Sequence, residues 1–238
     1  MRRTTAVTAA LIAASSIALI APSAQASSPN HRKLTGITSC DEGQAKLVTT
    51  VSKGGREHGK VTVSGLISKR WRGGLLLNPA AAFSSDESSD GLDLIFGKGR
   101  KTYVAKHGHF SAAASQRDAR TLDAMAVFRA GPKMCDISVG SDGEQFVVAG
   151  VMDTFGVKVD DGTLTAQVSG DAYHRYRVEY SVRTSAGVQH RSLVRTAGAI
   201  GILEPSASFK HLGSFTDAEA TITDLNLHTV IDRFRLER

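Results

Sequence analysis

Four residues of this chain have the spacing of a calcium-binding loop. Such a loop places carboxylates and a turn-forming glycine at its first, third, fifth and sixth positions, around a hard cation. The corresponding residues here are Asp86, Ser88, Asp90 and Gly91. The twelfth position, which supplies a bidentate glutamate in such loops, is Gly97. Calcium binding by Asp86 and Asp90 is therefore one hypothesis, and a plain acidic loop is the favoured alternative.

A second candidate metal site consists of His107 and His109. Because the two histidines alternate around Gly108, both imidazoles would face the same side of a β-strand and could share a zinc or copper ion. The sequence offers no further ligand. The favoured interpretation is a pair of surface histidines beside a turn, and no cofactor is predicted.

Arginine side chains alternate with apolar side chains over residues 175–183. Arg175, Arg177 and Arg183 would lie on one face of a strand. The opposite face would carry an aromatic and aliphatic row that consists of Tyr176, Val178, Tyr180 and Val182. The pattern predicts a half-buried strand with its arginines exposed.

This arginine row could bind an anionic ligand. A cell-wall polymer rich in phosphate would be held by charge and by bidentate hydrogen bonds from guanidinium groups. Arg191 and Arg195, near the following strand, could extend the row, although Glu179 interrupts it. The alternative, which spacing alone favours, is a solvated strand face whose cations discourage pairing with other strands.

The sequence lacks local motifs for catalysis. It contains no Gly-x-Ser-x-Gly elbow, no His-Glu-x-x-His and no phosphate-binding loop. A role that is not enzymatic is therefore favoured, and the alternative is a hydrolase whose catalytic groups meet only in the folded chain. Nucleic-acid binding is not expected, because the nine Phe, four Tyr and one Trp are not interleaved with exposed arginines.

The two cysteines of the chain, Cys40 and Cys135, lie near the two ends of its first half. In an exported protein an even number of cysteines indicates a disulfide, here one that joins the first strand of this half to its last. Closing a loop of about 95 residues would stabilise the fold by roughly 4 to 5 kcal/mol in the chain-entropy model. Two free thiols in a metal or catalytic site are the alternative.

Residues 1–26 have the composition of a secretory signal peptide. A basic start at Arg2 and Arg3 precedes an apolar, alanine-rich stretch, and cleavage is expected after Ala26. Polar residues interrupt the stretch, which is shorter than the ~20 apolar residues of a spanning helix. Loss of Arg2 and Arg3 lowers the net charge from +6 to +4. We expect a secreted, extracellular or wall-associated protein without a membrane span.

The chain repeats part of its own apolar pattern. Four positions of the first half recur at the same spacing in the second, where Leu47, Val51, Val61 and Val63 are matched by Leu164, Val168, Val178 and Tyr180. A later stretch aligns as well, with Gly108, Phe110, Ala113 and Leu122 matched by Gly213, Phe215, Ala218 and Leu227, and a one-residue insertion then aligns Phe128 with Phe234. Repetition at a long period indicates two copies of one module.

Each copy is predicted to contain a hairpin of two strands. The segment 47–52 would pair with 60–64 in the first copy, and 164–169 would pair with 175–183 in the second. Before the latter pair, Asp160-Asp161-Gly162 predicts a tight turn that links another strand to residues 164–169.

These elements predict an all-β fold. It would consist of two tandem immunoglobulin-like antiparallel β-sandwich modules, related by the internal repeat and spanning residues 27–141 and 142–238. The polar segment 84–91 would form a long exposed loop in the first module. Trp71, the single tryptophan, is expected in the core or at a strand edge, and a platform for binding a sugar is the alternative.

One series of residues in the first half resembles a known group of proteins. The series is Cys40, a strand to Val51, a strand from Lys60, Trp71, Gly108-His109-Phe110 and Ala126-Val127-Phe128 before Cys135. It is similar to small secreted immunoglobulin-like proteins of actinomycetes over about half of the mature chain. The resemblance implies the fold and an extracellular location, and it implies no catalytic residues. The second half departs from it by lacking both cysteines.

The function expected from the sequence is binding or structural, at the cell envelope or outside the cell. The partner would be an anionic cell-wall polymer or another extracellular protein. Two alternatives stay open, namely a secreted hydrolase with a site between the two modules and an extracellular inhibitor that presents the loop at residues 84–91.

Overall fold

The computed structural model describes residues 33–77, 101–117, 122–141, 145–149, 155–160 and 162–238. The segment predicted to be a signal peptide and the loop with Asp86 and Asp90 lie outside these ranges. Within them the chain forms β-strands and a single 3-10 turn, η1 (Leu212–Ser214), with no α-helix. The prediction of an all-β fold is confirmed.

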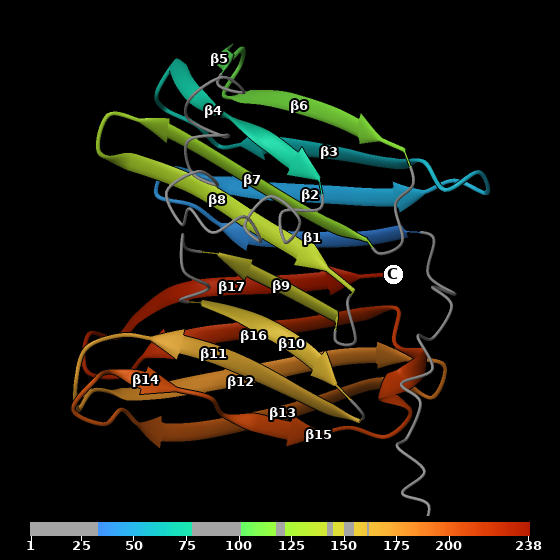
Figure 1. Ribbon diagram of the computed structural model, residues 1–238. Coiled ribbons are helices and arrows are strands. Elements are labelled where there is room, and N and C mark those ends of the chain that lie inside the picture. Colours follow the sequence, from blue (N-terminus) through green and yellow to red (C-terminus); the bar gives the residue numbers. More distant parts are fainter. Residues whose placement is uncertain (1–32, 78–100, 118–121, 142–144, 150–154, 161) are drawn as a thin grey trace, which may run out of the picture.

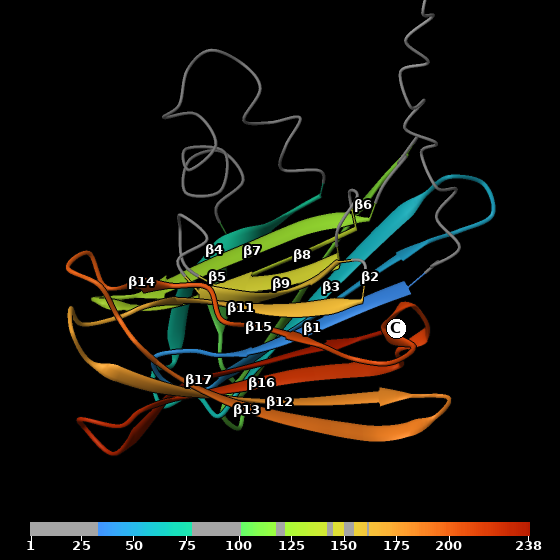
Figure 2. The ribbon, with the colours of Figure 1, turned by 90° about the horizontal axis from the view of Figure 1, so that it is seen from below.

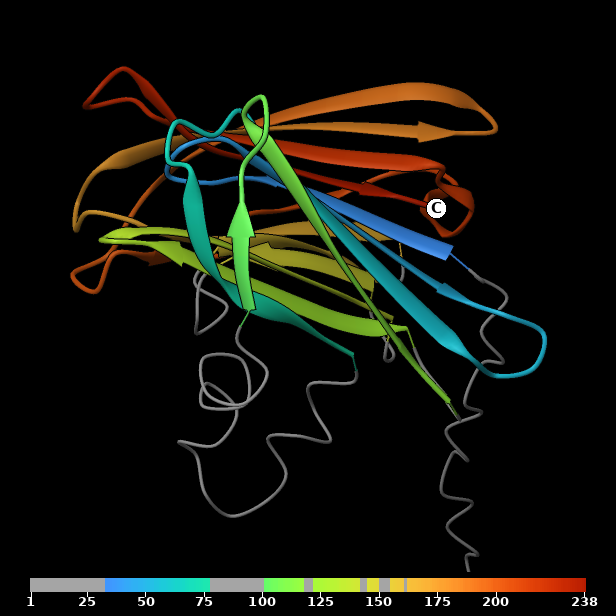
Figure 3. The same ribbon diagram turned by 90° about the horizontal axis from the view of Figure 1, so that it is seen from above.

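The strands form two antiparallel sheets that lie face to face as two layers (Figure 1; Figure 2). Sheet I has the order β13 (Gly187–Thr196), β12 (Arg175–Thr184), β16 (Asp217–Asp224), β17 (Thr229–Glu237), β1 (Lys33–Ser39), β2 (Gln44–Val51), β3 (Glu57–Ser64) and β6 (His109–Gln116). Sheet II has the order β14 (Ile202–Leu203), β11 (Thr163–Ser169), β10 (Phe155–Asp160), β9 (Gln145–Ala149), β8 (Lys133–Gly140), β7 (Asp123–Ala130), β4 (Arg70–Leu77) and β5 (Lys101–Val104), and β15 (Ser206–Ser208) also pairs with β11. Figure 3 shows the two layers from above.

The core lies between the two sheets and is built from alternate residues of each strand. On β12, Tyr176 and Tyr180 are buried while Arg175 and Arg177 are exposed, as the sequence predicts. Trp71 on β4 is fully buried and lies beside Phe110. Its indole N–H donates to the backbone carbonyl of Ser68 at 3.1 Å, so that burial leaves no unpaired donor. Trp71 is therefore a core residue.

A disulfide connects the two sheets in the first half of the chain. Cys40 follows β1 in sheet I, and Cys135 lies on β8 in sheet II. Their Cα atoms are 4.8 Å apart across 95 residues of sequence. The predicted pairing, and its role of joining the first strand of this half to the last, are confirmed.

Both sheets continue from one half of the chain into the other. In sheet I β17 pairs with β1, and in sheet II β8 pairs with β9. The strand order of sheet I becomes that of sheet II when each strand is replaced by one from the other half. The corresponding strands are β1 and β9, β2 and β10, β3 and β11, β4 and β12, β5 and β13, β6 and β14, β7 and β16, and β8 and β17.

Short sequence matches accompany this correspondence of strands. β4 begins with Arg70-Trp71-Arg72 and β12 begins with Arg175-Tyr176-Arg177. β7 begins with Asp123-Ala124, and β16 begins with Asp217-Ala218. The repeat predicted from the sequence instead aligns β2 with β11 and β7 with β17. By their places in the two sheets, β2 corresponds to β10 and β7 to β16, so the predicted alignment is displaced by one strand.

One of the two predicted hairpins is wrong. β2 and β3 pair as predicted, but β11 pairs with β10, β14 and β15 in sheet II, whereas β12 pairs with β13 and β16 in sheet I. The loop 170–174 thus crosses from one layer to the other. Alternation of apolar and polar residues shows which face of a strand is buried and does not identify its neighbour, which is why the pattern permitted both arrangements.

The turn predicted at Asp160-Asp161-Gly162 does connect two paired strands, β10 and β11. Gly162 has a φ of 82°, a conformation that glycine adopts without strain. The division into modules at residues 141 and 142 stays a prediction. It falls in the connection between β8 and β9, which are neighbours in sheet II.

Candidate functional site

The arginine row lies on the outer face of sheet I. Arg175, Arg177 and Arg183 are exposed on β12, because burial of the alternating Tyr and Val side chains turns the intervening residues outward. β12 is flanked on both sides, by β13 and β16. The three arginines therefore stand on a strand whose backbone is fixed by hydrogen bonds along both edges.

The acidic residue opposite Arg183 is bound by another arginine. Asp217 lies opposite Arg183 in the register of β12 and β16. Its two carboxylate oxygens accept hydrogen bonds of 2.9 and 2.8 Å from Nε and Nη2 of Arg235. This bidentate pair raises the pKa of Arg235 above its ordinary value. Among the described residues, Arg175, Arg177 and Arg183 form no ion pair, so their guanidinium groups are available to a ligand.

Arg191 and Arg195 do not extend this row. In the register of β12 and β13 they lie opposite Tyr180 and Tyr176, which are on the core side of the sheet. Arg191 also lies over the ring of Phe209, 5.8 Å from its centroid. The suggestion that these two arginines join the row is wrong. Alternate residues of a strand face opposite sides of the sheet, and Arg191 and Arg195 are on the side that faces the core.

The proposed histidine pair is not arranged as two strand residues. His107 and Gly108 occupy a turn, with φ angles of 52° and 76°, between the bridged residues Lys106 and His109. Only His109 belongs to a strand, β6, and its Nδ1 lies 3.4 Å from the carbonyl oxygen of His107. The assumption of a shared strand face is therefore wrong, since a tight turn rotates His107 away from strand geometry. The loop with Asp86 and Asp90 lies outside the described residues.

The structure does bring three other metal-ligating side chains together, at one end of the second half. Nδ1 of His174 lies 2.8 Å from Oδ2 of Asp224 and 3.7 Å from Oδ2 of Asp171. The carboxylate of Asp224 is buried, and its Oδ1 accepts hydrogen bonds from the backbone N–H groups of Asn226 and Leu227 at 2.8 and 3.0 Å. The cluster joins the loop between β11 and β12 to the turn between β16 and β17.

Electrostatics favours a protonated histidine in this cluster. The hydrogen bond to Asp224 raises the pKa of His174 above its ordinary value, against an opposing effect of burial. Burial raises the pKa of Asp224, but hydrogen bonds from His174 and from two backbone amides outweigh burial and lower it. The three ligand atoms lie within 4.8 Å of one another and could hold a cation. A proton on Nδ1 satisfies the same carboxylates.

Catalysis by this cluster would need a nucleophile or a bound water on the other ring nitrogen. Within the described ranges, no hydroxyl or thiol forms a hydrogen bond with Nε2 of His174. An aspartate orients the imidazole of a histidine and stabilises its protonated form. In a Ser-His-Asp triad the histidine then removes a proton from the serine hydroxyl, which acts as the nucleophile. The cluster is thus explained as a structural connection between two loops.

Sequence reasoning did not find this cluster, because its members come from two loops about 50 residues apart and share no local motif. A histidine and two aspartates are common in any chain of this length, so only the fold reveals their contact. In the part of the chain that the structure describes, no helix is both long and apolar enough to cross a membrane. No protein-family model matches the chain, and no curated protein is significantly similar to it.

Proposed function

We propose that this protein is exported and acts outside the cell as a binding protein without enzymatic activity. Its ligand is an anionic polymer of the cell envelope, and Arg175, Arg177 and Arg183 on β12 bind it. The signal-peptide pattern of residues 1–26 supports export. The disulfide between Cys40 and Cys135 is consistent with an oxidising compartment.

The observation that carries the proposal is the availability of three exposed guanidinium groups on one strand whose backbone is fixed on both sides. At a rise of ~3.4 Å per residue, Arg175 and Arg177 are about 7 Å apart and Arg183 lies about 20 Å further along. Such a row suits an extended chain with repeated negative charges better than a single small anion. Glu179 reduces the charge in the middle of the row, so binding would depend on its two ends.

The finer description of the fold is also a proposal. We infer that the chain contains two immunoglobulin-like modules that arose from one repeated unit and share both sheets. The equal strand order of the two sheets supports this, as do the matched starts of β4 and β12. It is in keeping with the resemblance to secreted immunoglobulin-like proteins of actinomycetes.

Retention of the protein on immobilised long-chain polyphosphate and on isolated cell walls tests the binding proposal. In the variant Arg175→Gln/Arg177→Gln we expect elution at clearly lower salt, because two phosphate contacts are lost. The matched control is Arg70→Gln/Arg72→Gln, which makes the same change of charge at the corresponding positions of β4. The control should elute with the wild type.

Two results would contradict the proposal. Equal shifts in both double variants would indicate that only net charge matters. Retention that does not respond to salt between 0.1 and 1 M, a range over which the Debye length falls from about 10 to about 3 Å, would exclude an electrostatic mechanism.

A further inference from the structure

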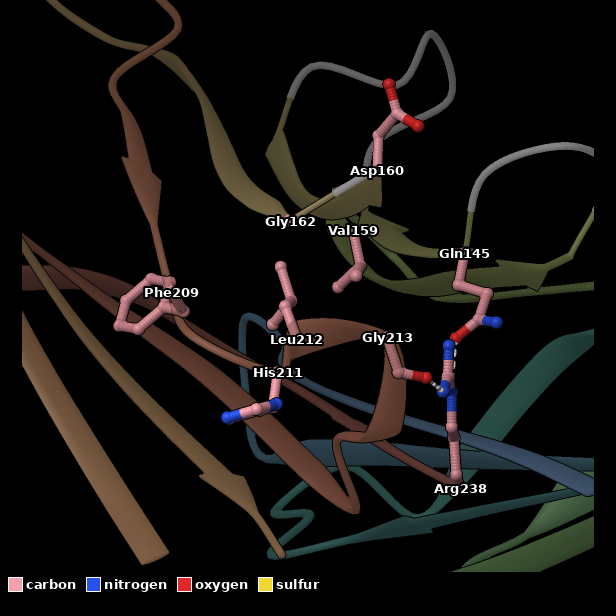
Figure 4. Close-up of a pocket in the computed structure, with 9 residues that line it drawn as sticks. All are labelled: Gln145, Val159, Asp160, Gly162, Phe209, His211, Leu212, Gly213 and Arg238. Carbon is pink, nitrogen blue, oxygen red and sulfur yellow. Dashed lines mark hydrogen bonds between the residues drawn. The ribbon is translucent and has the colours of Figure 1, made fainter. Parts of the chain in front are cut away.

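A pocket of about 380 Å³ opens at one end of the second half of the chain (Figure 4). It lies where β9 begins, where β10 ends and where the chain continues beyond β15 and β17. Its lining residues are Gln145, Val159, Asp160, Gly162, Phe209, His211, Leu212, Gly213 and Arg238. The volume is within the range of ~300 to 1,000 Å³ that small-molecule sites occupy.

The only guanidinium group in this lining, that of Arg238, is fixed in place. Its Nε donates to Oε1 of Gln145 at 2.6 Å, and its Nη1 donates to the carbonyl oxygen of Gly213 at 2.6 Å (Figure 4). The group also lies over the ring of Phe215, 4.0 Å from the centroid. These contacts leave little rotational freedom, so an anion would meet a donor that is already oriented.

One nitrogen of the Arg238 guanidinium group is left open for a ligand. Among the residues that the structure describes, no Asp or Glu side chain forms an ion pair with Arg238, and its Nη2 has no hydrogen-bond partner. Burial lowers the pKa of Arg238 to about 10, which keeps the group charged at neutral pH. An anionic ligand at Nη2 would therefore gain a charge-assisted hydrogen bond from a guanidinium group that is already in place.

The remaining lining contains an apolar surface. Val159, Phe209 and Leu212 are all nearly or fully buried and lie across the pocket from Arg238 (Figure 4). His211, between two of them, has a φ of 58° in the turn that leads into η1. Asp160, the one acidic residue of this lining, is exposed, and its carboxylate points away from Arg238 (Figure 4). The pocket therefore offers a fixed positive group on one side and an apolar wall on the other.

We infer that this pocket binds a small organic carboxylate, whose carboxylate accepts hydrogen bonds from Arg238 and whose apolar body packs against Phe209, Val159 and Leu212. The site is separate from the arginine row on the outer face of β12. The inference adds a small-molecule ligand to the proposed polymer ligand. It does not depend on the proposal that the arginine row binds a polymer.

The test uses ¹⁹F NMR of 4-fluorobenzoate, with 4-fluorobenzamide as the neutral isostere, mixed with the intact exported chain. We expect the benzoate signal to broaden at millimolar concentration and the benzamide signal to stay sharp. Arg238→Gln should abolish the broadening. Arg238→Lys, which keeps the charge but not the planar donor set, should weaken binding by about tenfold. Arg233→Gln, an exposed site on β17 with the same change of charge, is the control.

A second variant keeps the inference testable if Arg238→Gln does not fold. A Cβ placed on Gly213 would meet no atom within 4 Å, so Gly213→Leu can occupy the pocket while its backbone carbonyl still contacts Arg238. Gly198→Leu makes the same change at another open glycine outside the lining. Binding should be lost in the first and kept in the second.

Three results would overturn the inference. They are equal broadening of benzoate and benzamide, unchanged benzoate binding in Gly213→Leu, and no broadening in the wild-type chain at millimolar concentration. None of them bears on the arginine row, because Arg175 and Arg177 are unchanged in every variant of this experiment.

Discussion

His174 and Asp224 show how single side chains join loops in this protein. Their hydrogen bond of 2.8 Å links the loop before β12 to the turn after β16. Asp224 also holds the backbone of that turn through Asn226 and Leu227. The two side chains support each other's charged forms, so the strength of the link depends on pH.

The substitution His174→Gln tests that dependence. The pKa of His174 is raised by folding, so its contribution to stability is complete below about pH 6.5 and is lost as the pH rises through the folded-state value. The pKa of Asp224 is lowered, so its contribution is present above about pH 4 and is lost as the pH falls through its folded-state value. We expect the variant to lose more free energy of unfolding at pH 5.5 than at pH 8.5, measured with urea.

A suitable control is His190→Gln, which removes an exposed histidine on β13 that forms no ion pair with the residues that the structure describes. Its effect on stability should be small. A loss of stability in His174→Gln that is the same at both pH values would show that the imidazole contributes by packing rather than by charge.

Among the elements, β13 stands out as a ten-residue strand at the edge of sheet I, where β12 is its single neighbour among the described strands. Long exposed edges invite pairing with other chains. Here Nη1 of Arg191 donates to the carbonyl oxygen of His190, and Nη1 of Arg195 donates to that of Val194, each at 2.9 Å. Arg191 and Arg195 thus form hydrogen bonds with two backbone carbonyl groups of β13 and place positive charge beside this edge strand.

Removing both arginines should therefore promote self-association through β13. We expect Arg191→Thr/Arg195→Thr to show a larger weight-average mass than the wild type at equal concentration in sedimentation experiments, because the carbonyls of His190 and Val194 become free to pair. Arg175→Thr/Arg177→Thr, which removes the same charge from the outer face, should leave the mass unchanged. An increase in both variants, or in neither, would contradict a role for these two side chains at the edge.

At the scale of the whole molecule, the two halves of the chain are joined by strand pairing in both layers. β1 meets β17 in one sheet, and β8 meets β9 in the other. Gly36 on β1 lies at this junction, where a Cβ would come within 2.5 Å of Val139 on β8 and 2.8 Å of Val147 on β9. The two sheets therefore approach closely where the halves meet, and the absence of a side chain at Gly36 permits this approach.

The disulfide contributes to stability at this same scale, because it joins the two sheets across 95 residues. We expect Cys40→Ala/Cys135→Ala to reduce the free energy of unfolding by roughly 4 to 5 kcal/mol, chiefly because the unfolded chain regains its freedom. Urea unfolding of the oxidised wild type and of the variant measures the difference. A change below about 1 kcal/mol would contradict the entropic account, and reduction of the wild type should reproduce the effect of the substitutions.

Local pattern was sufficient to predict several features. Alternation over residues 175–183 predicted β12, its buried tyrosines and its exposed arginines. The count and placement of the cysteines predicted their bond. The alternation acts between residues that are close in the sequence, and each of the two cysteines has only the other as a partner. Neither prediction required knowledge of the fold.

Other features depended on which strands became neighbours. The arrangement of β11 and β12 in different sheets, the inward parity of Arg191 and Arg195, and the contact of His174 with Asp224 all follow from pairings between distant segments. The pocket around Arg238 likewise combines residues from 145 to 238. A period of two fixes the buried face of a strand and leaves its partner open. Local patterns therefore suffice to predict an all-β chain with one disulfide, whereas the side chains that meet depend on how the two sheets pack.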